Sequence, residues 1–157
     1  MSRVSRTLLR LGHRPWFAAV GRRFVPIDRW LFRHLGGRWT VADRFDLPSF
    51  LVLTTTGRKS GQPRTQPLVY TTDGDGWVVI GSNWGQAHHP AWTGNLLANP
   101  DASITLAGGT IEVRAELATG TEYDRLWKLL LAMWPAYQTY AERAAGRPLR
   151  IFRLARR

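Results

Sequence analysis

Two cations and a hydroxyl lie side by side in the first half of the chain: Arg58, Lys59 and Ser60, with a glycine on each side and Arg64 four residues later. Guanidinium, ammonium and hydroxyl groups can converge with backbone N–H groups on an anion such as a phosphate or a carboxylate. A surface hairpin with solvated basic side chains would carry the same residues, so spacing alone leaves both interpretations open. The segment lacks the frame of a P-loop, and no helix is predicted after it.

The residues of conventional catalytic sites are sparse. His88 and His89 are adjacent, so their side chains point in different directions, and no carboxylate stands at a metal-ligand spacing from them. We therefore expect no metal site. The chain has no cysteine, which excludes a disulfide, a thiolate nucleophile and an iron–sulfur cluster. A G-x-S-x-G nucleophile motif is also absent, so a hydrolase is disfavoured.

Aromatic residues gather near the predicted loops and helix starts. They are Trp84, Trp92, Trp134, Tyr137 and Tyr140. Each of them alone would be an ordinary core residue. Together with the basic hairpin, they suit a flat conjugated cofactor with an anionic tail, because rings stack on planes and arginines hold phosphate.

Helices and strands must position these residues, and the composition indicates what kind of domain can supply them. At 157 residues, 44% of them hydrophobic, the chain can form one domain with its own core. No apolar run reaches the roughly 20 residues of a membrane span, and no signal peptide is recognisable, so we expect cytoplasmic residence. The net charge of +11, carried almost wholly by arginine, is compatible with an anionic ligand, nucleic acid or membrane, or with a coding bias.

Residues 1–46 form a basic N-terminal segment that differs from the rest of the chain. Apolar residues recur at helical spacing from Trp16 to Phe24, and a second helix is predicted to begin at Pro26 and to end at Gly36. Such a basic amphipathic segment either lies on an anionic membrane, at the inner face of the cell membrane, or packs on the domain or on a second subunit. The sequence leaves these alternatives open.

Residues 47–157 show mainly β patterns. Strands are predicted at residues 50–56, 65–72, 77–82, 102–106, 110–117 and 148–154. Pro67 favours an edge or a bulge for the second strand, and a turn is predicted at residues 73–76. Short antiparallel strands interrupted by helices indicate an α+β fold, mainly β: a small barrel with flanking helices.

Three helices are expected within this region. The first follows His89 and Pro90 and ends near residue 97. The second begins at Thr121, with Asp124 completing a capping box, and its apolar face includes Leu126 and Leu130. Pro135 ends this helix and begins the third.

Four segments in this order resemble the deazaflavin-dependent nitroreductase family. They are TTTGRKSGQPRTQPLVY at residues 54–70, GSNWG at 81–85, HPAWTGNLLANP at 89–100 and WPAYQTY at 134–140. Members of that family are split β-barrel proteins of the FMN-binding type that use the deazaflavin coenzyme F420. The resemblance covers about residues 47–154.

The resemblance implies a set of coenzyme-binding residues. Those that would hold the phosphate and the polyglutamate tail are Arg58, Lys59, Ser60 and Arg64. Those that would line the coenzyme along the second strand are Thr65, Gln66, Pro67, Leu68, Val69 and Tyr70. Those that would contact the ring edge or close its other side are Gly81, Ser82, Asn83, Trp92 and Asn95. Tyr137 would reach the ring or the substrate, with Tyr140 nearby, and these two tyrosines and Ser82 are the candidate catalytic residues.

Three positions depart from the family pattern. Asn83 stands where members often carry lysine, and Trp134 and Val69 stand where tyrosines are frequent. The acceptor pocket therefore has fewer hydroxyls, which disfavours bicyclic nitroimidazoles as substrates more than quinones or activated alkenes.

The expected function is hydride transfer from reduced deazaflavin to a hydrophobic, electron-poor acceptor such as a quinone, an activated alkene or a nitro compound. One alternative is an FMN-binding oxidoreductase of the same fold. Another is a non-catalytic basic module for a membrane or an anion. We expect a monomer or a homodimer, with no nucleic-acid partner.

Overall fold

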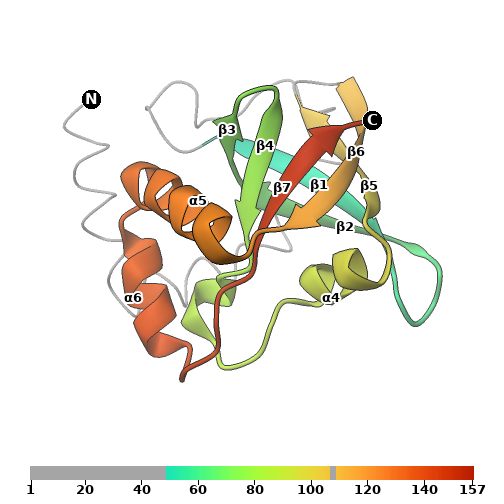
Figure 1. Ribbon diagram of the computed structural model, residues 1–157. Helices are drawn as coiled ribbons and strands as arrows, with labels where there is room; N and C mark the ends of the chain where they lie inside the picture. The colour runs from blue at the N-terminus through green and yellow to red at the C-terminus, as the bar shows by residue number, and fades with distance from the viewer. Residues whose placement is uncertain (1–48, 107–108) are drawn as a thin grey trace.

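The computed structural model describes residues 49–106 and 109–157, which form one seven-stranded sheet and its covering helices (Figure 1). The strands are β1 (Phe50–Thr56), β2 (Pro63–Val69), β3 (Thr71–Asp73), β4 (Gly76–Ile80), β5 (Asp101–Leu106), β6 (Gly109–Leu117) and β7 (Ile151–Arg156). Their order in the sheet is β2-β1-β5-β6-β7-β4-β3, and all neighbouring strands are antiparallel.

The sheet curls because its two edge strands are consecutive in the chain. β2 ends at Val69 and β3 begins at Thr71, so Tyr70 alone separates the two ends of the strand order. The Tyr70 backbone N–H donates to the Ser49 carbonyl oxygen at 3.2 Å. The edges must therefore approach each other, as in a split barrel, and the predicted mainly-β barrel is confirmed.

Within residues 49–106 and 109–157, three helices and a short 3-10 turn accompany the sheet. They are η1 (Asn83–Gly85), α4 (Ala91–Ala98), α5 (Gly120–Met133) and α6 (Ala136–Arg143). In Figure 1, α5 and α6 lie together on one side of β4, whereas α4 lies apart from them below the strands.

Two apolar clusters share β4, whose five residues are all buried. Trp77 and Val79 belong to the cluster inside the curled sheet, which includes Trp92 of α4. The alternate residues Val78 and Ile80 belong to the cluster beneath α5 and α6. A strand covered on both faces explains why this part of the sequence is continuously apolar.

Strand predictions agree with the structure in type and differ at the ends. The strand predicted at 50–56 matches β1, and β2 is an edge strand as Pro67 indicated. The single strand predicted at 65–72 is wrong, because the chain leaves one edge of the sheet at Val69 and joins the other at Thr71. The last strand begins at Ile151, three residues later than predicted.

The predicted capping box of α5 is wrong. The helix begins at Gly120, with Thr119 as its N-cap and no side-chain capping hydrogen bond. Gly120 has a φ of +54°, a conformation that favours glycine and turns the chain into the helix. The apolar face is confirmed, since Leu126 and Leu130 are fully buried.

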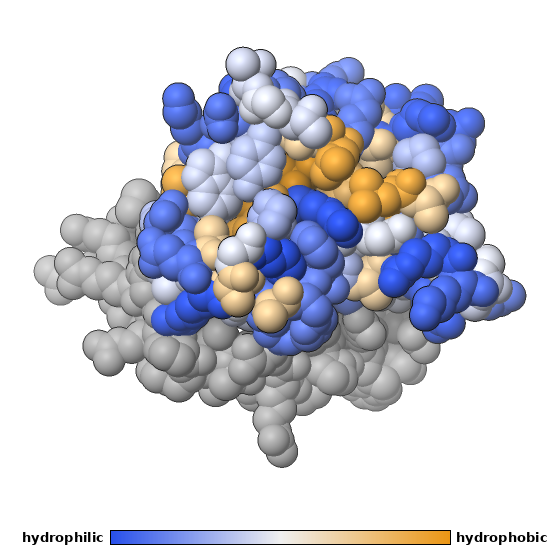
Figure 2. All heavy atoms as spheres, turned by 60° about the horizontal axis from the view of Figure 1, so that its bottom comes forward, coloured by the Kyte–Doolittle hydropathy of each residue, from blue (hydrophilic) through white to orange (hydrophobic). Residues whose placement is uncertain are grey.

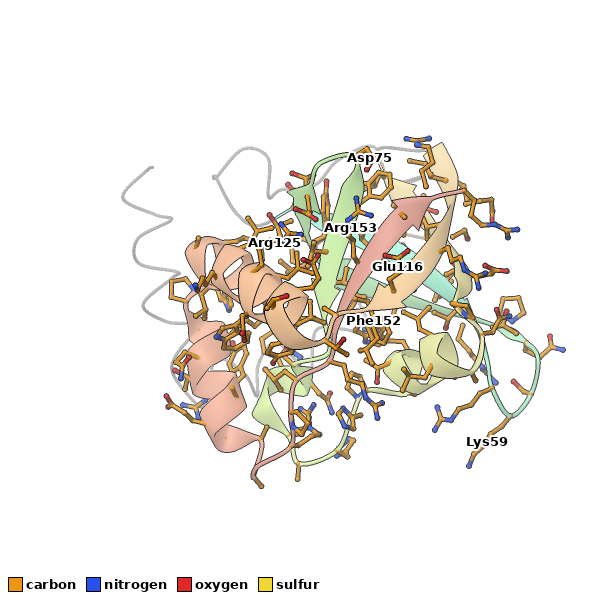
Figure 3. All side chains as sticks on the ribbon, viewed as in Figure 1. Lys59, Asp75, Glu116, Arg125, Phe152 and Arg153 are labelled. Carbon is orange, nitrogen blue, oxygen red and sulfur yellow. The ribbon has the colours of Figure 1, made fainter. Side chains whose placement is uncertain are left out.

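An ionic network attaches α5 to the sheet. Both carboxylate oxygens of Asp73 accept from Arg125, at 2.7 Å each, and Arg153 of β7 donates to Asp73 at 3.1 Å. Arg125 also pairs with Glu122, and Arg153 with Asp75. Figure 3 labels Asp75, Arg125 and Arg153 at this junction. The network ties the β3–β4 hairpin to a helix and to a central strand.

The predictions for the basic N-terminal segment fall on residues outside the described ranges. The amphipathic helices of residues 1–46, their membrane contact and the domain division at residue 46 therefore stay predictions.

Candidate functional site

The basic loop between β1 and β2 is held by hydrogen bonds within its own backbone. The Gly57 N–H donates to the Gln62 carbonyl oxygen at 2.8 Å, and the N–H groups of Ser60 and Gly61 donate to the Gly57 carbonyl oxygen at 3.2 and 2.7 Å. Gly61 has a φ of +68°, which few other residues adopt. The loop is a tight turn, and Lys59 extends from its tip, as Figure 3 shows.

Arg58 is directed toward α4. Its NH1 atom donates to the Ala91 carbonyl oxygen at 3.1 Å and to Asn95 Oδ1 at 3.4 Å, and its backbone N–H donates to the same Oδ1 at 3.2 Å. The guanidinium lies across Gly94, where a Cβ would approach NH1 to 2.8 Å. Two residues predicted to contact the coenzyme, Arg58 and Asn95, therefore contact each other.

Asn95 is buried and fully engaged between strand and helix. Its Nδ2 donates to Thr55 Oγ1 at 3.0 Å, and Thr55 Oγ1 donates to the Arg64 carbonyl oxygen at 3.4 Å. Trp92, on the same helix, is also buried and packs against Phe152 with ring centroids 5.7 Å apart. These two predicted residues form the wall behind the loop.

The other predicted residues of the loop and of β2 lie at the surface. Lys59, Ser60, Arg64 and Thr65 are exposed, and Arg64 NH2 donates to Ser60 Oγ at 3.4 Å. The half-buried residues that continue along the edge strand are Gln66, Pro67, Leu68, Val69 and Tyr70. The cations at one end of β2 thus lead to a more apolar stretch at the other.

Residues 81–85 pack against both α4 and α6. A Cβ at Gly81 would lie 2.6 Å from Thr93 Cγ2, and one at Gly85 would lie 3.0 Å from the Tyr140 carbonyl oxygen. Asn83, Trp84 and Gly85 have φ values of +47°, +56° and +77°. Three successive left-handed residues, two of them not glycine, are an uncommon and strained turn. Ser82 and Asn83 are half-buried.

Tyr137 and Tyr140 are buried in the cluster beneath α5 and α6. They are 5% and 2% exposed, and their ring centroids are 6.1 Å apart. Tyr140 also meets the Trp84 ring edge-on at 6.0 Å. Burial, and then Tyr140, raises the pKa of Tyr137. Burial also raises the pKa of Tyr140, and this effect exceeds that of a hydrogen bond with Trp134, which lowers the same pKa. Both hydroxyls therefore stay protonated at neutral pH.

One residue that was not predicted from the sequence connects the segment after α6 to residues 81–89. Arg147, after α6, donates to the carbonyl oxygens of Gly81, Ser82 and Gln86 and contacts His89 Nδ1 at 3.2 Å. In the sequence it is one arginine among many, so only the structure identifies it. Burial, with Arg150 and Arg147 nearby, lowers the pKa of His89, which is therefore neutral at pH 7.

The four sequence motifs form one continuous chain of contacts. The basic loop binds α4 through Arg58, α4 packs on Gly81 through Thr93, and Gly85 and Trp84 pack on Tyr140. Figure 2 shows this side of the molecule from below, where an apolar area is bordered by hydrophilic side chains. The contacts run from the exposed cations of the loop to the aromatic residues of α6, of which Tyr137 and Tyr140 are buried.

Two other kinds of site are not found in the described part of the chain. Residues 49–106 and 109–157 contain no group of three or more His, Asp or Glu residues placed to hold a metal ion. Within the same ranges, none of the helices has both the length and the apolar character that crossing a bilayer requires.

Comparison with known proteins extends over most of the chain. Residues 25–155 match the model of the F420H(2)-dependent quinone reductase family. The F420H(2)-dependent quinone reductase Rv1261c of Mycobacterium tuberculosis is 33% identical over 151 residues, which cover 85% of this chain and 100% of that protein.

Solved structures agree. One of an F420-H2 dependent reductase (FDR-A) is 29% identical, with a TM-score of 0.61 over 67% of this chain and 92% of the other. A second, described as a domain-swapped dimer, is 26% identical, with a TM-score of 0.64 over 82% of this chain and 96% of the other. The chain belongs to the F420H(2)-dependent quinone reductase family.

Proposed function

We propose that the basic loop, β2 and residues 81–83 hold coenzyme F420 in this chain, and that a hydrophobic quinone is the acceptor. Membership of the family makes the chain an F420H2-dependent oxidoreductase with coenzyme F420 as its cofactor. The observation that supports the proposed site is the contact chain that joins four motifs from residue 54 to residue 140, with cations at one end and aromatic residues at the other.

The residues present fit this coenzyme. A phosphate and a polyglutamate tail need exposed cations, which Lys59 and Arg64 supply beside the Ser60 hydroxyl. Gly81, proposed to contact the ring edge, has its backbone fixed by close packing on α4, because a Cβ there would lie 2.6 Å from Thr93 Cγ2. Among the described residues, β2 is an edge strand with a strand neighbour on one side only, and an edge strand is a position at which a sheet can contact a ligand.

The proposed roles follow from these positions. Lys59, Ser60 and Arg64 hold the anionic tail, and residues Thr65 to Tyr70 line the coenzyme. Gly81, Ser82 and Asn83 contact the ring edge. Arg58, Trp92 and Asn95 lie behind the loop, so we assign them to shaping the site.

The protein orients the reactants and supplies a proton. When bound, F420H2 supplies the hydride. A quinone that accepts a hydride needs one proton to become a hydroquinone, and a protonated tyrosine or the Ser82 hydroxyl could donate it. Tyr137 and Tyr140, from the fourth motif, are the proposed donors, and both phenols hold their proton at neutral pH.

Coenzyme binding and turnover test this proposal directly. The purified chain is titrated with F420, FMN and NADPH, and the oxidation of F420H2 is followed with a quinone, an enone and a nitroarene. We expect the tightest binding with F420 and the fastest turnover with the quinone. Tighter binding of FMN than of F420 would instead favour the FMN-dependent alternative.

Two further proposals concern partners. We propose that residues 1–46 attach the cytoplasmic enzyme to the inner face of the cell membrane, on the ground of the +11 charge. Sedimentation with anionic vesicles before and after deletion of residues 1–44 tests this, and retained reductase activity shows that the enzyme itself is intact.

A homodimer is the proposed assembly, since one similar structure is a domain-swapped dimer. Light scattering measures it.

A further inference from the structure

We propose that Arg147 is a positioning residue that holds residues 81–86 in the conformation which receives the coenzyme ring. The inference rests on the proposed function, because it takes these residues as part of the coenzyme site. Arg147 itself belongs to none of the four motifs.

The contacts of Arg147 bracket the strained turn. Its NH1 donates to the Gly81 carbonyl oxygen at 3.1 Å and its NH2 to that of Ser82 at 2.9 Å, both before the turn. Its Nε donates to the Gln86 carbonyl oxygen at 3.0 Å, after the turn. One planar guanidinium thus holds both ends of a segment in which Asn83 and Trp84 have positive φ.

A strained turn of this kind persists only where its surroundings fix it. The turn has two internal hydrogen bonds, from Gly85 N–H to Ser82 and from Gln86 N–H to Asn83, at 3.0 Å each. Asn83 Nδ2 adds a bond to the His88 carbonyl oxygen at 3.0 Å. Arg147 supplies three more bonds: those to Gly81 and Gln86 reach carbonyl oxygens that these contacts do not use, and the third shares the Ser82 carbonyl oxygen with the Gly85 N–H.

His89 completes the arrangement around Arg147. A guanidinium can only donate, so His89 Nδ1 must accept its hydrogen bond, which requires the neutral imidazole with its proton on Nε2. Burial and the charges of Arg150 and Arg147 favour that neutral form. Among the described residues, Arg147 forms no ion pair, so its charge faces backbone dipoles.

Arg147 could act as a positive charge or as a planar hydrogen-bond donor, and its geometry distinguishes these two roles. If Arg147 acted only as a positive charge that attracts an acidic coenzyme, lysine would replace it. If it acts by holding three carbonyl oxygens at once, lysine cannot, because an ammonium lacks the planar fork of five N–H donors.

The experiment compares R147M, R147K and R114M, the last removing an exposed arginine that pairs with Asp101 outside the proposed site. Two quantities are measured: the Kd for oxidised F420, and hydrogen exchange of residues 81–89 in the coenzyme-free protein. We expect R147M to raise the Kd for F420 about tenfold or more and to speed amide hydrogen exchange in residues 81–89. Both effects are expected because the conformation of residues 81–86 that binds the coenzyme becomes a minor state. R147K should recover only part of both effects, and R114M should match the unsubstituted chain.

The possible failures are distinguishable. If the unsubstituted chain does not bind F420, the proposed function fails. If it binds F420 and R147M binds within about twofold as tightly, or if exchange in 81–89 is unchanged, the inference about Arg147 is wrong. If R147K fully restores binding, the residue acts through its charge. Should R147M fold poorly, R147K alone tests the proposal: a raised Kd for F420 and faster hydrogen exchange in residues 81–89 support it, and unchanged values contradict it.

Discussion

Arg58 belongs to an exposed loop, yet its guanidinium points inward. It donates to Ala91 and Asn95 on α4, and it lies where a side chain at residue 94 would project. This explains why the helix has a glycine in its interior, where alanine would be favoured by about 1 kcal/mol. Gly94 is therefore a packing position for Arg58.

The substitution Gly94→Ala tests this packing. Its Cβ would approach Arg58 NH1 to 2.8 Å, so the guanidinium must leave α4. We expect the Kd for F420 to rise roughly 3- to 10-fold through loss of one or two hydrogen bonds that order the loop, while helicity by circular dichroism is unchanged. The double variant R58A/G94A is the control: it should bind no more weakly than R58A. Additive losses would contradict the argument.

Tyr137 gives a prediction about pH. Its pKa is raised by burial, so its phenol stays protonated, and able to donate, well above neutral pH. Tyr137→Phe should lower kcat with a quinone about tenfold or more, as expected for loss of a general acid. Because a raised pKa postpones loss of the proton, kcat of the unsubstituted chain should show no decline from this group between pH 7 and about 10. Equal kcat values for the two chains would reject Tyr137 as the donor.

At the scale of elements, the ionic network decides how α5 is attached. Hydrogen bonds from Arg125, and then from Arg153, lower the pKa of Asp73 below its ordinary value of 3.8. A lowered carboxylate pKa stabilises the fold fully above pH 3.8 and less as the pH falls through the folded-state value. The α5 junction should therefore weaken in acid.

Asp73→Asn tests this attachment. Removing the charge leaves Arg125 and Arg153 without their shared partner, and we expect a loss of about 1–2 kcal/mol in the free energy of unfolding at pH 7. The difference between the two chains should shrink as the pH falls below about 4. Urea denaturation at several pH values measures it. Asp124→Asn, on the same helix, is the matched control. A difference that is independent of pH would mean that Asp73 acts through packing alone.

Much of the element list could be predicted because local patterns determine it. The β-branched run of β1, the apolar run of β4 and Pro135 before α6 each mark an element on their own. The break at Tyr70 could not be predicted, since it arises where two edges of one sheet meet. The positive φ of Asn83 and Trp84 is likewise fixed by Arg147, more than sixty residues away.

The candidate site divides in the same way. The exposed cations Lys59 and Arg64 could be predicted from residue type, because their surface position needs no long-range partner. The inward turn of Arg58 and the burial of Asn95 depend on α4 packing against β1, which no local pattern encodes. Residue type therefore predicts which of these side chains are exposed better than it predicts which of them contact each other.

For the whole molecule, β7 is the strand on which cooperativity depends. It lies between β6 and β4, and Phe152 and Leu154 are buried within the inner cluster. We expect the amides of β4 and β7 to exchange only through global unfolding, because opening β7 divides the sheet. Their exchange free energies should equal the unfolding free energy from urea denaturation. Lower values for β7 alone would show that it opens independently.

The position of β7 also has a consequence during synthesis. Before residues 151–156 leave the ribosome, the strands of the described residues can form only two separate parts of this sheet, β2-β1-β5-β6 and β3-β4. Nascent chains at that stage present the bare flanks of β6 and β4, which are templates for neighbouring polypeptides. Crowded polysomes therefore favour aggregation of this protein until β7 is able to pair with both strands.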